Sequence, residues 1–290
     1  MKAPAFDYAR PETLEEVHAL LAEHGDDARI LAGGQSLMPT LALRLSGPAL
    51  LVDVNRIPGL GAIEARGDGL QIGALARHAA VLASPLVAAR APVLTRALPH
   101  VGHVAIRSRG TFGGSIALAD PAAEIPACAL ALEAEVVLEG ADGSRVVPAA
   151  DFFLGLYETA REPDEVVTAV RLPSQAGRRF GFAELARRHG DFALAGIAAS
   201  ARLDHDDRVT ELRLVCFGCA DRAVLADSAA ARALGRRLDA ATIAEVAAGL
   251  GADVEPIPSP EADAETRLHW ARVLTARVLG ALPTTPEVDA

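Results

Sequence analysis

Two glycine-rich segments carry the residue types in this chain that best suit chemistry with a phosphate group. The first is Ala32-Gly33-Gly34-Gln35-Ser36, and the second is Arg109-Gly110-Thr111-Phe112-Gly113-Gly114-Ser115. Paired glycines let a backbone approach a bulky anion, and successive free amides form a concave nest for phosphate oxygens. Neither segment has the spacing of a Walker A loop or a Rossmann turn. Each alone is more often a plain turn, but two in one chain make a diphosphate site an equally reasonable interpretation.

Two acids follow the second segment. Asp120-Pro121 has the residue types that commonly begin a helix, as N-cap and first helical residue. Glu124 lies one turn later, where an acid interacts favourably with the helix dipole. Both acids can therefore serve a helix start without any ligand.

The basic side chains near these segments also have two interpretations. Arg107 and Arg109 could neutralise phosphate, or they could face solvent or a partner subunit. His78 and His103 are the nearest histidines, and a lone histidine is usually a surface or capping group. We therefore assign no general base.

The cysteines give little evidence of chemistry. Cys216 and Cys219 have C-x-x-C spacing at an expected strand end, but no second pair completes a zinc site. We interpret them as packed thiols. Three cysteines cannot build a disulfide framework, which indicates a reducing compartment. A nucleophile elbow, a metal-binding histidine pair and a paired-carboxylate signature are also absent from the sequence.

Composition limits the class of protein. The chain has 290 residues, 51% of them hydrophobic, which is enough for a large core. Its formal charge of −10 argues against a nucleic-acid partner. The sequence has neither an apolar run long enough to span a membrane nor the apolar region of a signal peptide. We therefore expect a cytoplasmic protein.

The elements around the glycine segments alternate between helices and strands. Thr13-Leu14-Glu15-Glu16 is typical of a capping box, and Gly25 is placed to end that helix. A short strand enters the first segment and a helix follows it. Further strands are expected at 49–54, 70–74, 135–139, 145–147 and 165–172, with a hairpin turn at 141–143.

A polar stretch without periodicity, residues 174–179, is the best candidate for a linker. Beyond it we expect strands at 180–187, 193–203 and 209–217, and then helices near 223–234, 240–250 and 261–279. Strands followed by helices favour a small α+β domain.

Several motifs occur in the order found in one known family. They are Ile30 to Pro39 with Arg44, Leu51 to Ile57, Val101 to His103, Ile106-Arg107, Arg109 to Ser115, Ala119 to Glu124 and Phe180 to Ala195. Over almost its whole length the chain resembles the flavoprotein (medium) subunits of molybdenum hydroxylases. That family includes the medium chains of carbon monoxide dehydrogenase and of bacterial xanthine, nicotine and caffeine dehydrogenases.

The resemblance implies an α+β fold in two domains. Residues 1–176 would form a FAD-binding domain of the vanillyl-alcohol oxidase (PCMH) type, with subdomains at about 1–58 and 59–176. Residues 177–290 would form a small α+β C-terminal domain with a three-stranded antiparallel sheet and helices.

The resemblance also implies an electron-transfer role. FAD, held non-covalently, would accept electrons from iron–sulfur clusters in a small subunit, and substrate would be hydroxylated at a molybdenum cofactor in a large subunit. The expected assembly is a dimer of heterotrimers. An iron–sulfur cluster within this chain would need four cysteine thiolates, and only three cysteines are present.

The resemblance implies a cofactor-binding set and no catalytic or metal-binding residue. Ser36, Thr111 and Asp120 would hydrogen-bond the cofactor, Glu124 would support its ribityl side, and Phe192 would lie over or beside the isoalloxazine. Relatives often have aspartate at the position of Glu124 and tyrosine at that of Phe192. The full set is Leu31, Ala32, Gly33, Gly34, Gln35, Ser36, Leu37, Val101, Gly102, Ala105, Ile106, Gly110, Thr111, Gly113, Gly114, Ser115, Ala117, Asp120, Glu124, Glu184 and Phe192.

Two alternatives stay open. A free-standing flavin oxidase or reductase of the same fold would need its own substrate pocket and often carries a covalent flavin. A scaffold subunit that has lost FAD is disfavoured by the two intact glycine pairs.

Overall fold

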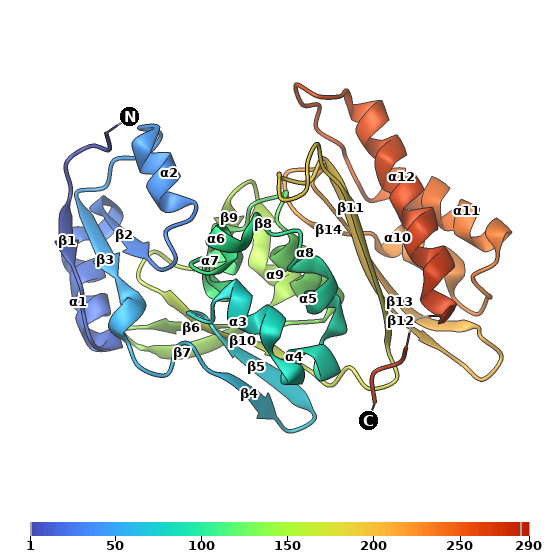
Figure 1. Cartoon of the computed structure of the whole chain (residues 1–290), viewed down its shortest axis with the longest axis horizontal. Coiled ribbons are helices and arrows are strands. Elements are labelled where there is room, and N and C mark those ends of the chain that lie inside the picture. The colour runs from blue at the N-terminus through green and yellow to red at the C-terminus, as the bar shows by residue number, and fades with distance from the viewer. Residues whose placement is uncertain (1, 285, 290) are drawn as a thin grey trace.

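The computed structural model describes residues 2–284 and 286–289 and contains three main sheets, each with its own helices (Figure 1). The N-terminal module, in blue, is a parallel sheet in the order β1-β3-β2. Within the described residues, no helix is long and apolar enough to cross a membrane. The elements of the N-terminal module are β1 (Asp7–Ala9), α1 (Leu14–His24), β2 (Ala28–Leu31), α2 (Leu37–Ala42) and β3 (Leu50–Asp53).

Helix α1 begins and ends as its sequence predicts. The Thr13 hydroxyl accepts the Glu16 N–H at 3.2 Å. The Glu16 carboxylate accepts the N–H of Glu12, one residue earlier than in a standard capping box, at 2.7 Å. Gly25 ends the helix with φ +52°. The apolar face of α1, including Val17, is buried against the parallel sheet.

The middle module is an antiparallel sheet in the order β4-β5-β10-β6-β7, with helices α3 to α8 stacked over it (Figure 1). The predicted hairpin is present, and Gly143 takes φ +130° in its turn. The elements are β4 (Ile63–Arg66), β5 (Gly69–Gly73), α3 (His78–Ala83), α4 (Pro85–Arg90), α5 (Pro92–Ala97), α6 (Val104–Arg107), α7 (Phe112–Leu118), α8 (Glu124–Ala131), β6 (Glu135–Gly140), β7 (Gly143–Pro148), α9 (Ala149–Phe152), β8 (Phe153–Gly155), β9 (Glu158–Thr159) and β10 (Val166–Leu172).

The C-terminal module is an antiparallel sheet in the order β11-β12-β13-β14 followed by helices. The sheet therefore has four strands, one more than the sequence predicted. The fourth strand, β14, lies in a stretch predicted as helix, because Val224 and Leu225 pair with β13. The elements are β11 (Arg179–Leu185), β12 (Ala195–Leu203), β13 (Val209–Phe217), β14 (Val224–Leu225), α10 (Asp227–Ala230), α11 (Ala240–Gly249) and α12 (Ala264–Ala281).

The C-terminal sheet is covered on both faces. Helices α5 and α8 of the middle module pack on one face, and α11 and α12 lie on the other (Figure 1). Strand β12 is accordingly buried over seven consecutive residues. Cys216 and Cys219 are buried thiols in the core beneath α12, with sulfurs 3.6 Å apart, which confirms their interpretation as packed thiols.

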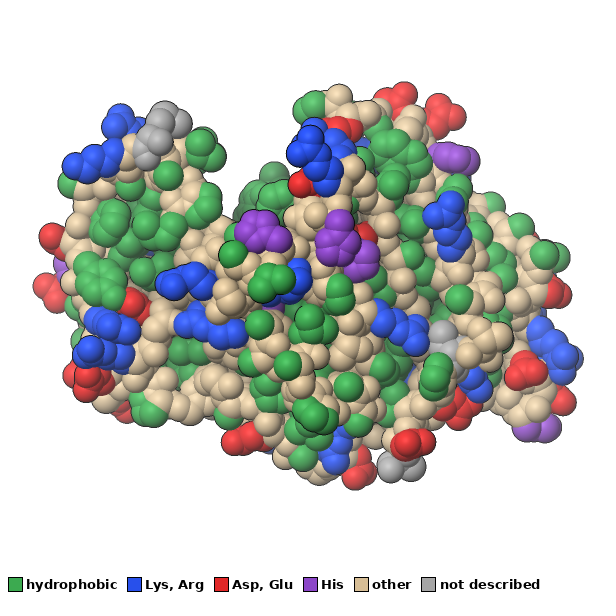
Figure 2. All heavy atoms as spheres, viewed as in Figure 1, with side chains coloured by type: hydrophobic (Ala, Val, Ile, Leu, Met, Phe, Trp, Pro, Cys, Tyr) green, Lys and Arg blue, Asp and Glu red, His purple; other side chains and the backbone are tan. Residues whose placement is uncertain are grey.

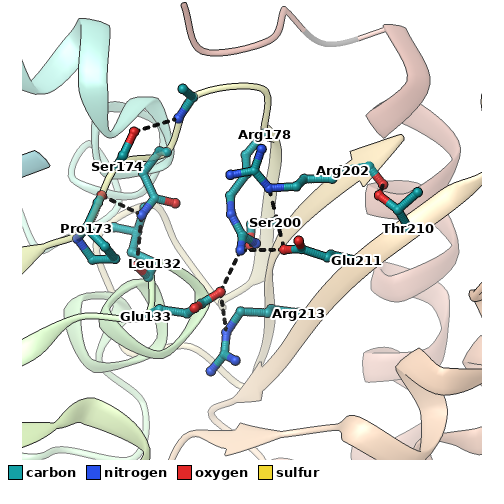
Figure 3. A network of polar contacts seen from close by, with 12 residues as sticks. Leu132, Glu133, Pro173, Ser174, Arg178, Ser200, Arg202, Thr210, Glu211 and Arg213 are labelled. Atoms are coloured by element: carbon teal, nitrogen blue, oxygen red, sulfur yellow. Dashed lines mark hydrogen bonds and ion pairs between the residues drawn. The ribbon is translucent and has the colours of Figure 1, made fainter. Parts of the chain in front are cut away.

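The polar stretch predicted as a linker is packed between the middle and C-terminal modules (Figure 3). Gln175 is buried, and its amide donates to the Leu132 carbonyl at 3.0 Å. The buried Arg178 guanidinium donates to Glu133 and Glu211, each at 2.7 Å. Helix α8 ends here, and its last carbonyl groups have no partner within the helix. The polar side chains of this stretch hydrogen-bond such groups, so a polar sequence can be buried at this connection.

Candidate functional site

The two glycine-rich segments are in direct contact. A Cβ atom placed on Gly33 would lie 2.4 Å from the Arg109 carbonyl oxygen and 2.8 Å from the Gly110 Cα. Only glycine permits this approach, because real Cβ atoms do not come so close to backbone atoms. The structure therefore brings together residues far apart in sequence, as a shared binding site requires.

The first segment is open. It runs from the end of β2 to the start of α2, and Gly34 takes φ +70°. The N–H groups of Gly34, Gln35 and Ser36 donate to no acceptor within the described residues. The Ser36 side chain is exposed and makes no capping bond to α2. This segment offers consecutive free donors, the arrangement that binds anions.

The second segment is closed. The N–H groups of Phe112 and Gly113 donate to the Ala76 and Ala74 carbonyls, both at 2.9 Å. The Thr111 hydroxyl caps α7 by accepting the Gly114 N–H at 3.2 Å. The N–H groups of Gly110 and Ser115 are also bonded within the segment or to α6. Among the described residues, only the Thr111 N–H of this segment has no acceptor, and its other amides are occupied by the fold.

A hydrogen-bonded clamp joins the two segments. The Asn55 amide donates to the Ala32 carbonyl at 2.8 Å, which holds the first segment. The Arg77 guanidinium donates to the Arg109 carbonyl, which holds the second, and to Asn55 Oδ1 at 2.5 Å. Asn55 follows β3 and Arg77 precedes α3, so the clamp also links two modules.

A hollow of about 470 Å³ lies at the first segment. Its walls are the segment itself, Tyr8, Asp53 and Asn55 near the ends of the parallel strands, and Arg109. Asp53 is engaged by the Tyr8 hydroxyl and lies 3.6 Å from the Arg10 guanidinium. Figure 2 shows a notch in the surface between the N-terminal module and the rest of the molecule.

The acids after the second segment lie where helix α8 begins. Asp120 is not the helix N-cap, which corrects the sequence-based interpretation: Ala123 holds that position. The Asp120 carboxylate instead accepts the Ala122 N–H at 2.9 Å in a turn before α8, since an Asx turn satisfies the same oxygen locally. Tyr157 donates to its other oxygen at 3.4 Å. Glu124 is the first residue of α8 and is 7% exposed.

Glu184 comes from strand β11 and is near Glu124. Its carboxylate lies 3.1 Å from His100 Nδ1, and this contact raises the pKa of His100. Burial raises the pKa of Glu124 to about 8, and the negative charge of Glu184 adds to the effect. The two acids therefore share one environment at the contact of the middle and C-terminal modules.

Phe192 lies apart from the glycine segments and is 72% exposed, so it is not a core phenylalanine. It precedes β12, which begins at Ala195 and not at residue 193 as the sequence predicted. Gly190 takes φ +86° and packs on Gly102 of the middle module, which turns the chain here. Phe192 lines a second hollow of about 410 Å³ with Arg187 and Arg267.

The histidines and arginines left unassigned have defined positions. His78 is buried rather than at the surface, because it packs on Gly110 and its Nε2 lies 3.1 Å from Ser115 Oγ. Burial lowers the pKa of His78 to about 4. Arg107 donates to three carbonyls of the 99–102 turn. Arg109 and His103 are exposed.

The remaining predicted cofactor residues are described by their backbone conformation and exposure. Gly102 takes φ +51°, and a Cβ there would touch Ile106 at 3.0 Å. Ala105 is exposed. The other residues are half-buried, namely Leu31, Ala32, Leu37, Val101 and Ala117.

Sequence reasoning did not single out Asn55, Arg77 or His100. Asn55 follows a buried strand that ends beside the first segment, and this position could have suggested it. The other two depend on contacts between distant parts of the chain, which no local pattern reveals.

Comparisons with known proteins agree with this geometry. Residues 4–175 match the family described as the FAD binding domain in molybdopterin dehydrogenase, and residues 180–282 match the CO dehydrogenase flavoprotein C-terminal domain. The chain is 36% identical to the 6-hydroxypseudooxynicotine dehydrogenase complex subunit alpha of Paenarthrobacter nicotinovorans, with 100% of both chains covered. It is 37% identical to the carbon monoxide dehydrogenase medium chain of Hydrogenophaga pseudoflava, covering 97% of this chain and 98% of that one.

Solved structures give the same result. Carbon monoxide dehydrogenase from Hydrogenophaga pseudoflava matches with a TM-score of 0.95 and 38% identity, covering 98% of this chain and 99% of that chain. Quinoline 2-oxidoreductase from Pseudomonas putida 86 matches with a TM-score of 0.93 and 37% identity over the same shares. The chain therefore belongs to the family of FAD-binding medium chains of molybdenum hydroxylases.

Proposed function

We propose that this chain is the FAD-carrying electron-transfer subunit of a molybdenum-containing hydroxylase complex. Bound FAD supplies the chemistry, since its ring takes up electrons from a one-electron donor and passes them to an external acceptor. The chain's own residues hold the cofactor, orient it and set its surroundings. The described side chains do not need to perform acid–base catalysis on an organic substrate.

The observation that carries the proposal is the open first segment beside the hollow. Gly34, Gln35 and Ser36 present three free N–H donors, and the exposed Arg109 lines the hollow together with Gly34 and Gln35. This donor set fits the diphosphate of a dinucleotide, because several N–H groups and one cation can neutralise two phosphates together.

The other predicted cofactor residues take roles that follow from their surroundings. Thr111 uses one acceptor site to cap α7, and its O–H stays free to donate to the cofactor. Glu124 begins α8 and Asp120 lies in the turn before it, and both are proposed to lie at the ribityl side of FAD. Phe192, exposed at the edge of the C-terminal module, is proposed to lie beside the isoalloxazine.

The proposed partners are an iron–sulfur small subunit and a molybdenum-cofactor large subunit, assembled as a dimer of heterotrimers in the cytoplasm. Full-length similarity to the medium chain of carbon monoxide dehydrogenase supports the partners. The three free, buried cysteines are consistent with a reducing compartment. We also propose that residues 1–176 bind FAD while residues 177–290 form the C-terminal domain.

The test is the flavin content and the partners of the purified protein. We expect a two-banded flavin spectrum, with all flavin released by heat or acid, and co-purification with an iron–sulfur and a molybdenum protein from the native host. A covalent flavin with turnover by the isolated chain would favour the free-standing oxidase. A colourless, folded chain in the complex would favour the scaffold.

A further inference from the structure

Three ionisable side chains lie near one another at the contact between the middle and C-terminal modules. Glu124 begins α8, His100 follows α5, and Glu184 comes from β11, which packs on α5. His100 Nδ1 and Glu184 Oε1 are 3.1 Å apart. The His100 ring also lies against His189, with centroids 5.5 Å apart and planes at 26°.

The two acids of the cluster are buried and short of partners, while the His100 side chain is half-buried. The Glu184 side chain is 3% exposed, and its second oxygen, Oε2, is buried without a hydrogen-bond partner in the described chain. Glu124 is 7% exposed, and no described side chain hydrogen-bonds or ion-pairs with it. A buried oxygen without a partner costs free energy unless a proton or a ligand group satisfies it.

The charges around Glu124 do not balance if both acids are ionised. Glu184 and Asp120 act on it as further acids, and among the described residues His100 is the cationic group that opposes them. Cys128, one turn along α8, is a buried thiol and brings no positive charge. Burial and the neighbouring carboxylate together raise the pKa of Glu124 to about 8.

We propose that Glu124, Glu184 and His100 form a proton-holding site, in which Glu124 is a neutral carboxylic acid beside a Glu184–His100 ion pair, and that this site exchanges one proton as the flavin is reduced and reoxidised. The second part rests on the proposed function. Electrons from an iron–sulfur partner bring no protons, so the protons taken up on reduction must come from the protein or from water. When the flavin is reduced, the O–H bond of Glu124 breaks, the electron pair stays on the carboxylate and the proton passes to the reduced flavin. When the flavin is reoxidised, the proton that it releases, or one from solvent, re-forms the O–H bond.

The first test is infrared spectroscopy of the full chain without FAD. At pH 7, wild type should show the carbonyl band of a protonated carboxylic acid, and Glu124→Gln should lose it. Glu165→Gln is the matched control, because Glu165 is equally buried but is paired with Arg145 at 2.6 and 2.8 Å, so its loss should remove carboxylate bands only.

A titration of wild type alone keeps the proposal testable if the variants do not fold. The acid band should convert to carboxylate with a midpoint near pH 8. The absence of any protonated carboxyl at pH 7, or its persistence in Glu124→Gln, would overturn the site.

The second test measures the flavin midpoint potential of the FAD-loaded chain from pH 6 to 9. The pH dependence should change slope near pH 8 in wild type and Glu165→Gln, and not in Glu124→Gln. Identical curves in all three would overturn the exchange of a proton with flavin reduction. A chain that binds no FAD contradicts the proposed function itself, while the infrared result still decides the proton-holding site.

Discussion

The two glycine-rich segments have similar sequences and opposite environments. In the first, the N–H groups of Gly34, Gln35 and Ser36 are free among the described residues, and Gly34 and Gln35 line a hollow. In the second, the N–H groups of residues 110 and 112–115 are all bonded within the protein. One glycine pair therefore leaves donors free beside a hollow, and the other permits close packing.

The difference shows which atoms each glycine accommodates. Gly113 lets α7 pack on Ala74, since a Cβ there would lie 2.4 Å from the Ala74 Cβ. Gly33 lets the first segment pack on the second. We infer that the second segment is a rigid wall against which the first is positioned, and that the first supplies most of the donors for the cofactor.

The largest effect is expected at the wall. Gly113→Val should lower the free energy of unfolding by about 3 kcal/mol, because the added atoms overlap the backbone and side chain of Ala74. Urea denaturation followed by circular dichroism measures this. Gly61→Val is the control, since nothing lies within 4 Å of a Cβ at Gly61. Equal stabilities for the two variants would mean that the second segment is not tightly packed.

The next effect concerns the contact between the segments. Gly33→Ala should weaken FAD binding at least about tenfold by pushing the first segment away from Arg109, with a smaller loss of stability than Gly113→Val. Fluorescence titration of the apoprotein with FAD gives the affinity. The comparison variant is Gly47→Ala in the same module, where the nearest atom would be 3.7 Å away. If Gly33→Ala bound FAD normally, the contact would have no part in binding.

The clamp gives a third prediction. Asn55→Ala and Arg77→Leu should each weaken FAD binding about tenfold, and the double variant should lose less than the sum, because both act through one connection. Arg90→Leu serves as control, since Arg90 also donates to backbone carbonyls, those of Gly67 and Gly69. Fully additive losses would show that the two residues act independently.

Ser36 in the first segment and Thr111 in the second are expected to differ in their effects on FAD affinity and on stability. Ser36→Ala should weaken FAD binding by up to about tenfold and leave stability unchanged, because the Ser36 side chain is exposed and makes no cap. Thr111→Ala should lower stability by about 1 kcal/mol, since it removes the α7 cap. Paired measurements of affinity and unfolding decide this, and the reverse pattern would contradict the assignment.

The last prediction concerns the pH dependence of stability, an effect that is spread over several pH units. Burial raises the pKa of Glu124 to about 8 from its ordinary value near 4.5, so only the folded chain holds this proton between those values. Stability should therefore fall as pH rises through this window, by at most about 1.4 kcal/mol per pH unit, and level off above it. In Glu124→Gln the contribution should vanish. A stability profile unchanged by the substitution would show that Glu124 titrates normally.

Much of the fold could be predicted from sequence because its signals are local. The cap at Thr13, the glycine end at Gly25 and the hairpin before Gly143 each depend on a few neighbouring residues. Strand β14 and the packed connection at Gln175 and Arg178 were not predicted, because their partners lie far away in the sequence.

The candidate site shows the same limit. The sequence motifs identify both glycine segments. Which of the two is open depends on which backbone N–H groups are hydrogen-bonded to other parts of the fold. The Phe112 and Gly113 amides are bonded by residues 74 and 76, which belong to no motif. The clamp through Asn55 and Arg77 joins two segments that no periodicity connects.

Amide hydrogen exchange with and without FAD distinguishes the open segment from the closed one. We expect the amides of Gly34, Gln35 and Ser36 to exchange rapidly without FAD and to become protected when it binds. The amides of Phe112, Gly113 and Gly114 should be protected in both states, because the fold already bonds them. Protection by FAD at the second segment, with the first segment unchanged, would contradict the account.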